Sequence, residues 1–155
     1  MKKIYLLLVV MATIGCVSCN NEWEDEQFVQ KVSFKATLNS DGVCPVYVRY
    51  QPDGVKKYDV PLVVSGSTLN SQKRTVHIGL DLDTLETLNL ERFGTYRKEL
   101  YYKPLDPQYY TMPEMVEIPA GQSQAVLPIS FTLGGTDNSN PLNMVEQYIL
   151  PLTIY

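Results

Sequence analysis

Short runs in which apolar and polar residues alternate, separated by turn-forming residues, constrain the fold of this chain most. Most even positions from Phe28 to Leu38 are apolar, and Val76, Ile78 and Leu80 repeat the pattern. A period of two is typical of strands with one buried face, whereas amphipathic helices repeat about every 3.6 residues. Ten prolines, nine glycines and eleven tyrosines among 155 residues also favour strands and turns. The sequence therefore predicts an all-β protein.

The strands are predicted to build one domain over residues 28–155. Its further strands are expected at 43–50, 55–64, 115–118, 125–133 and 148–154. Residues 51–54 read Gln-Pro-Asp-Gly, a turn signal that predicts a hairpin between 43–50 and 55–64. Pro128 is expected at a sheet edge or a bulge, because it cannot donate to a neighbouring strand. Seven to eight short strands with turns between them indicate an immunoglobulin-like antiparallel β-sandwich.

One short helix is predicted after Asp83, where the apolar period changes. Apolar residues within 85–93 recur at helical spacing, and Asp83 stands three residues before Glu86, as in an N-cap with its reciprocal acid. Gly94 is expected to end the helix, since glycine readily adopts the backbone conformation that follows a last turn.

The N-terminus has the pattern of a lipoprotein signal peptide, predicted over residues 1–18. Two lysines precede an apolar run at 4–14, which is shorter than the roughly twenty residues that span a bilayer. A cysteine preceded by a small residue follows twice, at Cys16 and Cys19, which resembles a bacterial lipobox. Cys19 is favoured as the lipidated residue because the chain turns abruptly polar after it, and Cys16 is the alternative.

Residues 19–27 are predicted to form an acidic tether. The run Glu22–Glu26 holds four acidic residues around Trp23 and is too charged to pack. Its position directly after a lipidated cysteine resembles a signal that exports lipoproteins to the outer face of the outer membrane; the alternative is a merely solvated tether. We therefore expect a protein anchored in the outer membrane by its N-terminal lipid and exposed at the cell surface.

The net charge and the cysteine content bear on two further properties, nucleic-acid binding and disulfide formation. The formal net charge is −4, from 13 basic and 17 acidic residues, which offers no basic face for a phosphate backbone. Nucleic acid is therefore excluded as an expected partner. With Cys19 lipidated after cleavage, Cys44 is the remaining thiol, so no internal disulfide is expected. Cys44 lies in an apolar strand pattern and is predicted to be a small buried hydrophobe.

Several short segments follow one another in an order that resembles a known family. The segments are Val64–Thr68, Thr75–Ile78, Asp81–Leu85, Leu100–Tyr102, Tyr109–Tyr110, Val116–Gly121 and Ile149–Ile154. Their order and spacing resemble an uncharacterised family of surface lipoproteins encoded in polysaccharide-utilisation loci of Gram-negative gut anaerobes. The resemblance implies an immunoglobulin-like N-terminal module, of the kind that often precedes a lectin-like sandwich or a glycosidase barrel. It carries over no catalytic or ligand residues.

Metal and cofactor sites are not expected. His77 is the only histidine, and no carboxylates or cysteines stand at a recognisable ligand spacing from it. Asp81, Asp83 and Glu86 lack the twelve-residue loop of alternating oxygens that holds calcium, so they are interpreted as helix-capping and solvated acids.

Catalytic motifs are also missing from the sequence. A glycosidase needs two carboxylates held across a cleft, and Glu114 and Glu117 only flank a proline turn. There is no nucleophile elbow, phosphate loop or dinucleotide fingerprint. We therefore expect that the chain is not an enzyme.

A cluster of tyrosines is the one sequence feature that points to a ligand. Its members are Tyr96, Tyr101, Tyr102, Tyr109 and Tyr110. A tyrosine ring offers a flat apolar face to the C–H side of a sugar and a hydroxyl for hydrogen bonding, so an exposed row could bind a glycan. The alternative is that these rings fill the space between the sheets.

Two functions follow from these observations. The first is a non-catalytic, lipid-anchored surface module that supports glycan binding or a glycan-uptake complex, with glycans or other surface lipoproteins as partners. The second is a structural or adhesive subunit whose terminal strand, over Tyr148–Tyr155, pairs with another chain.

Overall fold

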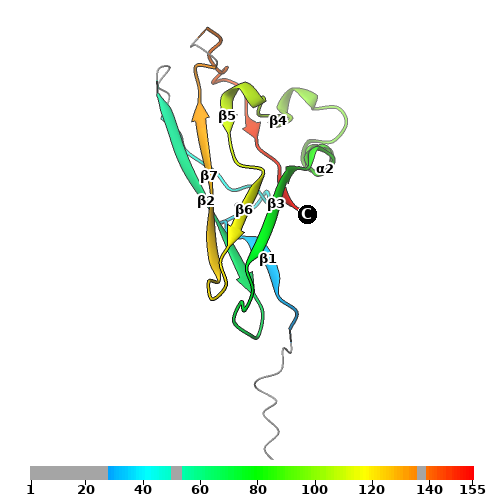
Figure 1. Cartoon of the computed structure of the whole chain (residues 1–155). Helices are drawn as coiled ribbons and strands as arrows, with labels where there is room; N and C mark the ends of the chain where they lie inside the picture. The colour runs from blue at the N-terminus through cyan, green and yellow to red at the C-terminus, as the bar shows by residue number, and fades with distance from the viewer. Residues whose placement is uncertain (1–27, 50–53, 136–138) are drawn as a thin grey trace, which may run out of the picture.

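A computed structural model describes residues 28–49, 54–135 and 139–155 of the protein (Figure 1). The predicted signal peptide, Cys19, the acidic tether and Trp23 lie outside the described residues, as does most of the turn at 51–54.

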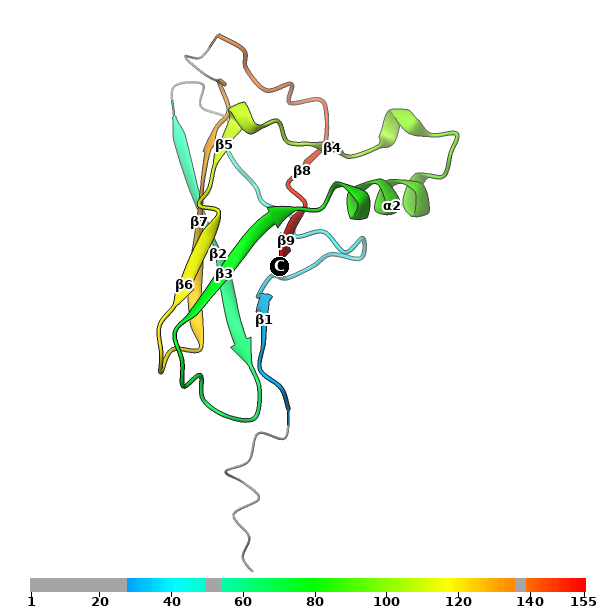
Figure 2. The same ribbon diagram turned by 45° about the vertical axis from the view of Figure 1, so that its right-hand side comes forward.

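Two antiparallel sheets form the body of the protein. The first has the order β1-β2-β7-β5, with β1 at Lys31–Phe34, β2 at Val55–Ser65, β7 at Gln124–Thr132 and β5 at Tyr110–Thr111. The second has the order β6-β3-β9, with β6 at Met115–Ile118, β3 at Arg74–Leu80 and β9 at Leu152–Ile154. Figure 2 shows these two layers side by side. A small additional pair joins β4, at Lys103–Pro104, to β8, at Tyr148–Ile149.

The longest pairing in the fold joins β2 to β7. The two strands are antiparallel and in register from Val55 opposite Thr132 to Val63 opposite Gln124. On its other side β2 pairs with β1, from Phe34 opposite Leu62 to Lys31 opposite Ser65. Both edges of the C-terminal half of β2 are therefore occupied within its own sheet.

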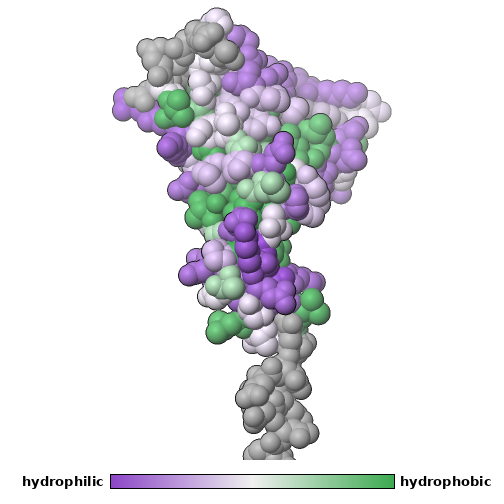
Figure 3. All heavy atoms as spheres, in the orientation of Figure 1, coloured by the Kyte–Doolittle hydropathy of each residue, from purple (hydrophilic) through white to green (hydrophobic). Residues whose placement is uncertain are grey.

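The core lies between the two sheets and is built by alternation along the strands. In β2, Val60, Leu62 and Val64 are buried, and their neighbours are more exposed. Three side chains from different strands are essentially inaccessible to solvent: Leu62, Ile118 and Leu127. On the face seen in Figure 3, apolar side chains show at mid-height, with hydrophilic ones above and to the sides. These features confirm the predicted all-β sandwich.

Strand number and direction differ from the prediction in detail. The described residues contain nine strands instead of seven or eight. Three of them, β4, β5 and β8, are only two residues long. The expected terminal strand over 148–154 is divided into β8 and β9 around Pro151, whose carbonyl accepts a hydrogen bond from the Asp81 amide (2.8 Å). In addition, β4 and β8 run parallel, whereas the expected sandwich was antiparallel throughout.

Pro128 lies where the sequence predicts it, at a position with one strand neighbour. It stands opposite Asp59 of β2, while β5 pairs with β7 only at Ser130 and Phe131. No strand in the described part of the chain pairs with the other side of β7 at this residue, so the missing amide of proline costs no ladder hydrogen bond there.

The predicted helix exists and ends where expected, but it begins earlier. Helix α2 spans Leu82–Phe93, and the Gly94 amide donates to the Leu90 carbonyl at 2.9 Å with a glycine φ of 68°. Its N-cap is Asp81 and not Asp83: the Asp81 carboxylate accepts from the Thr84 amide at 2.9 Å and from its hydroxyl at 2.7 Å. These hydrogen bonds, first the one from the Thr84 hydroxyl, lower the pKa of Asp81.

The predicted hairpin between 43–50 and 55–64 is wrong. Residues 43–49 form no strand, and β2 takes β1 and β7 as its partners. The alternation in 43–49 still has a structural meaning, since Val48 packs against the core. The first strand is also shorter than predicted, because Phe28 and Leu38 are exposed and lie outside β1.

Neighbouring positions of β7 allow a direct test of the core. Leu127 is inaccessible, so Leu127→Ala should lower the free energy of unfolding by about 2–5 kcal/mol through lost burial and the cavity left behind. Val126 is 47% exposed, so Val126→Ala is the matched control and should cost about 1 kcal/mol or less. Urea unfolding measures both. Equal losses in the two variants would contradict the described register.

Candidate functional site

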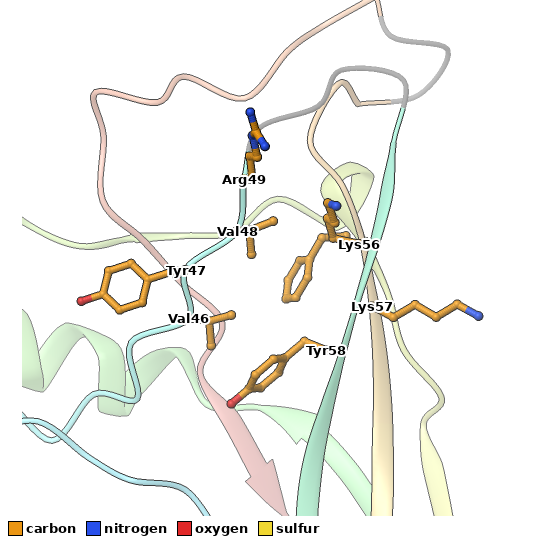
Figure 4. Close-up of a pocket in the computed structure, with 8 residues that line it drawn as sticks. Val46, Tyr47, Val48, Arg49, Lys56, Lys57 and Tyr58 are labelled. Atoms are coloured by element: carbon orange, nitrogen blue, oxygen red, sulfur yellow. The ribbon is translucent and has the colours of Figure 1, made fainter.

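A pocket of about 280 Å³ opens between β2 and the segment 46–49 (Figure 4). Figures 1 and 2 show β2 and β7 extending beyond the end of β3, so the second sheet does not cover this end of β2. Segment 46–49 lies over the inner face there in place of a strand. The lining comes from residues 46–49, residues 56–58 and Phe131.

The β2 wall of the pocket is formed by two inward-facing residues. Lys56 and Tyr58 are half-buried and alternate with the exposed Lys57, so they face the same side as the buried Val60. Phe131 of β7 stands opposite Lys56 in the strand register and is 9% exposed. This wall therefore combines two aromatic rings with one lysine.

The opposite wall is aliphatic and ends in an arginine. Figure 4 shows Val46 and Val48 directed toward β2, whereas the 94% exposed Tyr47 points away from the space. Arg49 follows at the end of the described segment and is exposed. In the same view Arg49 and Lys56 lie toward one end of the pocket.

The two cations of the pocket have no carboxylate partner. Among the residues that the structure describes, neither Lys56 nor Arg49 forms an ion pair; the cations that do are Lys73, Arg92, Arg97 and Lys103. Lys56 also occupies a position where strand alternation calls for an apolar side chain. A half-buried cation without a counter-charge loses hydration without gaining an ion pair. The pocket thus presents positive charge that no described acidic group neutralises.

Tyr58 is held by a cysteine. Its hydroxyl and the Cys44 Sγ form a hydrogen bond across 3.8 Å. This hydrogen bond, followed by burial and the electrostatic interaction with Cys44, raises the pKa of the Tyr58 phenol. The phenol is therefore neutral at physiological pH. Cys44 was predicted to be a small buried hydrophobe. It is only half-buried and has a polar contact.

The five predicted ligand-binding tyrosines lie in three different environments. Tyr96 is 96% exposed. Tyr109 is 7% exposed and belongs to the core, and the half-buried Tyr110 packs against that core. Tyr101 and Tyr102 contact the end of α2. The structure therefore does not bring the five rings together in one exposed row, and a binding role for the accessible ones stays a prediction.

The contacts of Tyr101 and Tyr102 are those of a structural clamp. Their rings pack on Phe93 with centroids 6.1 and 5.5 Å away. The Asn89 side chain, itself 5% exposed, accepts from the Tyr102 amide at 2.8 Å and donates to its carbonyl at 2.9 Å. The Arg92 guanidinium lies over the Phe93 and Tyr102 rings. This clamp fixes the segment that follows the helix.

A smaller cavity of about 250 Å³ lies beside this clamp, where α2 meets the turn at 39–43. Here the positive charge is already neutralised, because Arg92 forms an ion pair with Asp41. The turn is held by the Asn39 side chain, which accepts from the Asp41 and Val43 amides at 2.9 and 3.0 Å. This cavity is therefore a weaker candidate than the pocket beside β2.

The other candidate residues have structural surroundings. His77 is exposed and stacks at 5.7 Å on the ring of Tyr155. Glu117 forms an ion pair with Lys73. The described residues contain no group of three or more His, Cys, Asp or Glu placed to hold a metal ion. Within the same residues, none of the helices has the length and apolar character needed to cross a membrane.

Sequence reasoning missed the pocket beside β2. The segment 46–49 was expected to pair with β2 as a strand, which leaves no space between them. The available signal was Lys56, a cation at an inward position of an otherwise alternating strand. It stands next to Lys57, and a pair of adjacent lysines on its own indicates a solvated surface.

Comparison with known proteins places the chain in a family. Residues 23–155 match the family described as a domain of unknown function, DUF4973. The chain belongs to this family. A search of curated proteins gives no match.

Solved structures from Bacteroides resemble this DUF4973 domain. A Bacteroides ovatus protein of unknown function is 49% identical, with a TM-score of 0.71, over 79% of this chain and 39% of its own. A Bacteroides ovatus multidomain protein including DUF1735 is 48% identical, with a TM-score of 0.71, over 80% and 40%. A Bacteroides thetaiotaomicron protein named an auxiliary nutrient binding protein is 31% identical, with a TM-score of 0.54, over 77% and 34%. The chain spans well under half the length of each.

The contact between Tyr58 and Cys44 gives a test of the pocket geometry. Cys44→Ala removes the hydrogen bond and the electrostatic interaction with the sulfur, so the pKa of Tyr58 should fall toward its ordinary value of 10.0. Val43→Ala is the control, since it leaves the thiol in place. NMR titration of ¹³C-labelled tyrosine, assigned with Tyr58→Phe, measures the change. An unaltered Tyr58 titration in Cys44→Ala would show that the two groups are apart.

Proposed function

We propose that this DUF4973 domain is a non-catalytic, lipid-anchored module at the cell surface that supports the binding of glycan nutrients or a glycan-uptake complex. The observation that carries the proposal is the likeness to the protein named an auxiliary nutrient binding protein, at 31% identity. The pocket beside β2 supports it, because aromatic and aliphatic walls with a few polar groups are typical of small-molecule sites.

The length of the relatives supports a modular role. Each of the three covers most of this chain, while the chain covers between 34% and 40% of theirs. A domain that recurs within longer proteins is suited to position a neighbouring binding domain. Other domains or other surface lipoproteins are accordingly the partners that we propose.

The position of the pocket fits a protein attached through its N-terminus. Figure 1 shows the first described residues at the lower end of the sandwich, where the Phe28 amide donates to the Ser67 hydroxyl at 3.0 Å. The pocket lies toward the other end, beside the start of β2. In the proposal, a lipid on Cys19 holds the protein in the outer membrane, so the end that carries the pocket faces away from the membrane.

The alternative function, assembly through the terminal strand, has less support. Residues 148–155 already have partners within the domain: β8 pairs with β4, and β9 pairs with β3. The Tyr155 amide also donates to the His77 carbonyl at 3.2 Å. A strand that pairs with another chain would have to use the remaining edge of β9 or give up these contacts.

Cysteine variants in intact cells test the proposed attachment and its consequence. The parent and the control Cys16→Ala should incorporate radiolabelled palmitate, be cleaved by external protease and capture glycan-uptake proteins after crosslinking. Cys19→Ala should lose the label, since it removes the acylated sulfur. It should also lose the captured proteins.

Three results would contradict the proposal. They are equal labelling of parent and Cys19→Ala, recovery of the parent from the cytosol, and capture of no glycan-uptake component by a correctly exposed parent.

A further inference from the structure

We infer that the pocket between β2 and residues 46–49 binds one acidic sugar unit, a saccharide that bears a carboxylate or a sulfate. The inference rests on the proposed function and narrows it, because it assigns glycan contact to this domain and names the class of glycan. Neither the family description nor the names of the similar structures specify a charged ligand.

The charge of the pocket selects the anion. Lys56 projects inward from β2 at a half-buried position, and Arg49 stands at the same end of the pocket. Neither has an ion-pair partner within the described parts of the chain. A bound carboxylate or sulfate would supply charge-assisted hydrogen bonds, which are shorter and stronger than neutral ones. The hydrogen bonds to a bound anion therefore replace the hydration that Lys56 loses on burial.

The walls of the pocket select a sugar over a small inorganic anion. Val46 and Val48 face Tyr58 across the space, and Phe131 stands beside Lys56. Aliphatic and aromatic surfaces pack against the C–H face of a sugar ring, and the neutral phenol of Tyr58 can exchange hydrogen bonds with ring hydroxyls. An inorganic ion would use the two cations and leave these walls without contact.

The volume of the pocket limits how many sugar units of a glycan it can hold. Its volume of about 280 Å³ lies just below the range of small-ligand pockets, roughly 300–1,000 Å³. This is enough for one charged sugar unit and insufficient for a long run of a chain. The pocket therefore recognises a single unit, with the rest of the glycan outside.

The clamp at the end of α2 also combines a cation with aromatic rings, but it is a weaker candidate for binding an acidic sugar. Arg92 lies over the Phe93 and Tyr102 rings, but it is already paired with Asp41. An acidic sugar would have to displace that carboxylate. Lys56 and Arg49 require no such exchange.

Isothermal titration calorimetry on the full-length chain in detergent tests the inference. The probes are a galacturonate trisaccharide, a sulfated chondroitin-type oligosaccharide, neutral maltotriose and sodium sulfate. Lys56→Met keeps the aliphatic stem but removes the charge, and Arg49→Gln removes the exposed charge. Lys31→Gln is the matched control, because Lys31 is an exposed lysine of β1 that does not line the pocket.

We expect at least one acidic oligosaccharide to bind about tenfold more tightly, or better, than maltotriose. Lys56→Met and Arg49→Gln should each weaken that binding by about tenfold, whereas Lys31→Gln should leave it within about twofold. Thermal unfolding of each variant verifies that it is folded. If Lys56→Met does not fold, Arg49→Gln carries the test alone, since its side chain is exposed and outside the core.

Each contrary outcome overturns the inference. Equal affinity for acidic and neutral sugars, or unchanged binding in a folded pocket variant, removes the role of the two cations while glycan binding itself stands. If sodium sulfate binds as tightly as the sulfated sugar, the site holds an adventitious ion only. If no saccharide binds, this domain does not recognise glycans directly. The capture experiment on intact cells then decides the proposed function separately.

Discussion

The antiparallel pairing of β2 with β7 determines most of this structure. It spans nine residues of each strand and aligns the buried side chains that face the second sheet. The second sheet is shorter, because β3 pairs with β6 at one end and with β9 at the other and then leads directly into α2. One end of the inner face of β2 therefore lacks a covering strand. The candidate pocket is a consequence of this mismatch in length.

The core could be predicted from the sequence because it depends on local alternation. Val60, Leu62 and Val64 are inward positions whatever strand pairs with β2, and Gly94 ends α2 for reasons that lie within the helix itself. Strand partners depend on competition between distant segments, which a local pattern does not record. Residues 43–49 alternate like a strand, but β1 and β7 occupy the edges of β2.

The candidate site was harder to predict because closeness in sequence is a poor guide to closeness in space. Tyr109 and Tyr110 are adjacent, yet one is buried in the core and the other only partly so. Tyr101 and Tyr102 were identified for their rings, but their contacts with Phe93 make them part of the clamp at the end of α2. Lys56 carried the more useful signal, since its inward position conflicts with the hydrophobic pattern around it.

The fold and the unpaired cations support one proposal for this DUF4973 domain: the open end of its sandwich binds an acidic sugar. The most direct measurement is an ¹⁵N–¹H NMR titration of the domain with an acidic oligosaccharide. The account predicts shift changes at the amides of residues 46–49, residues 56–58 and Phe131. Changes confined to residues 92–102 around the clamp, or no changes at all, would contradict it.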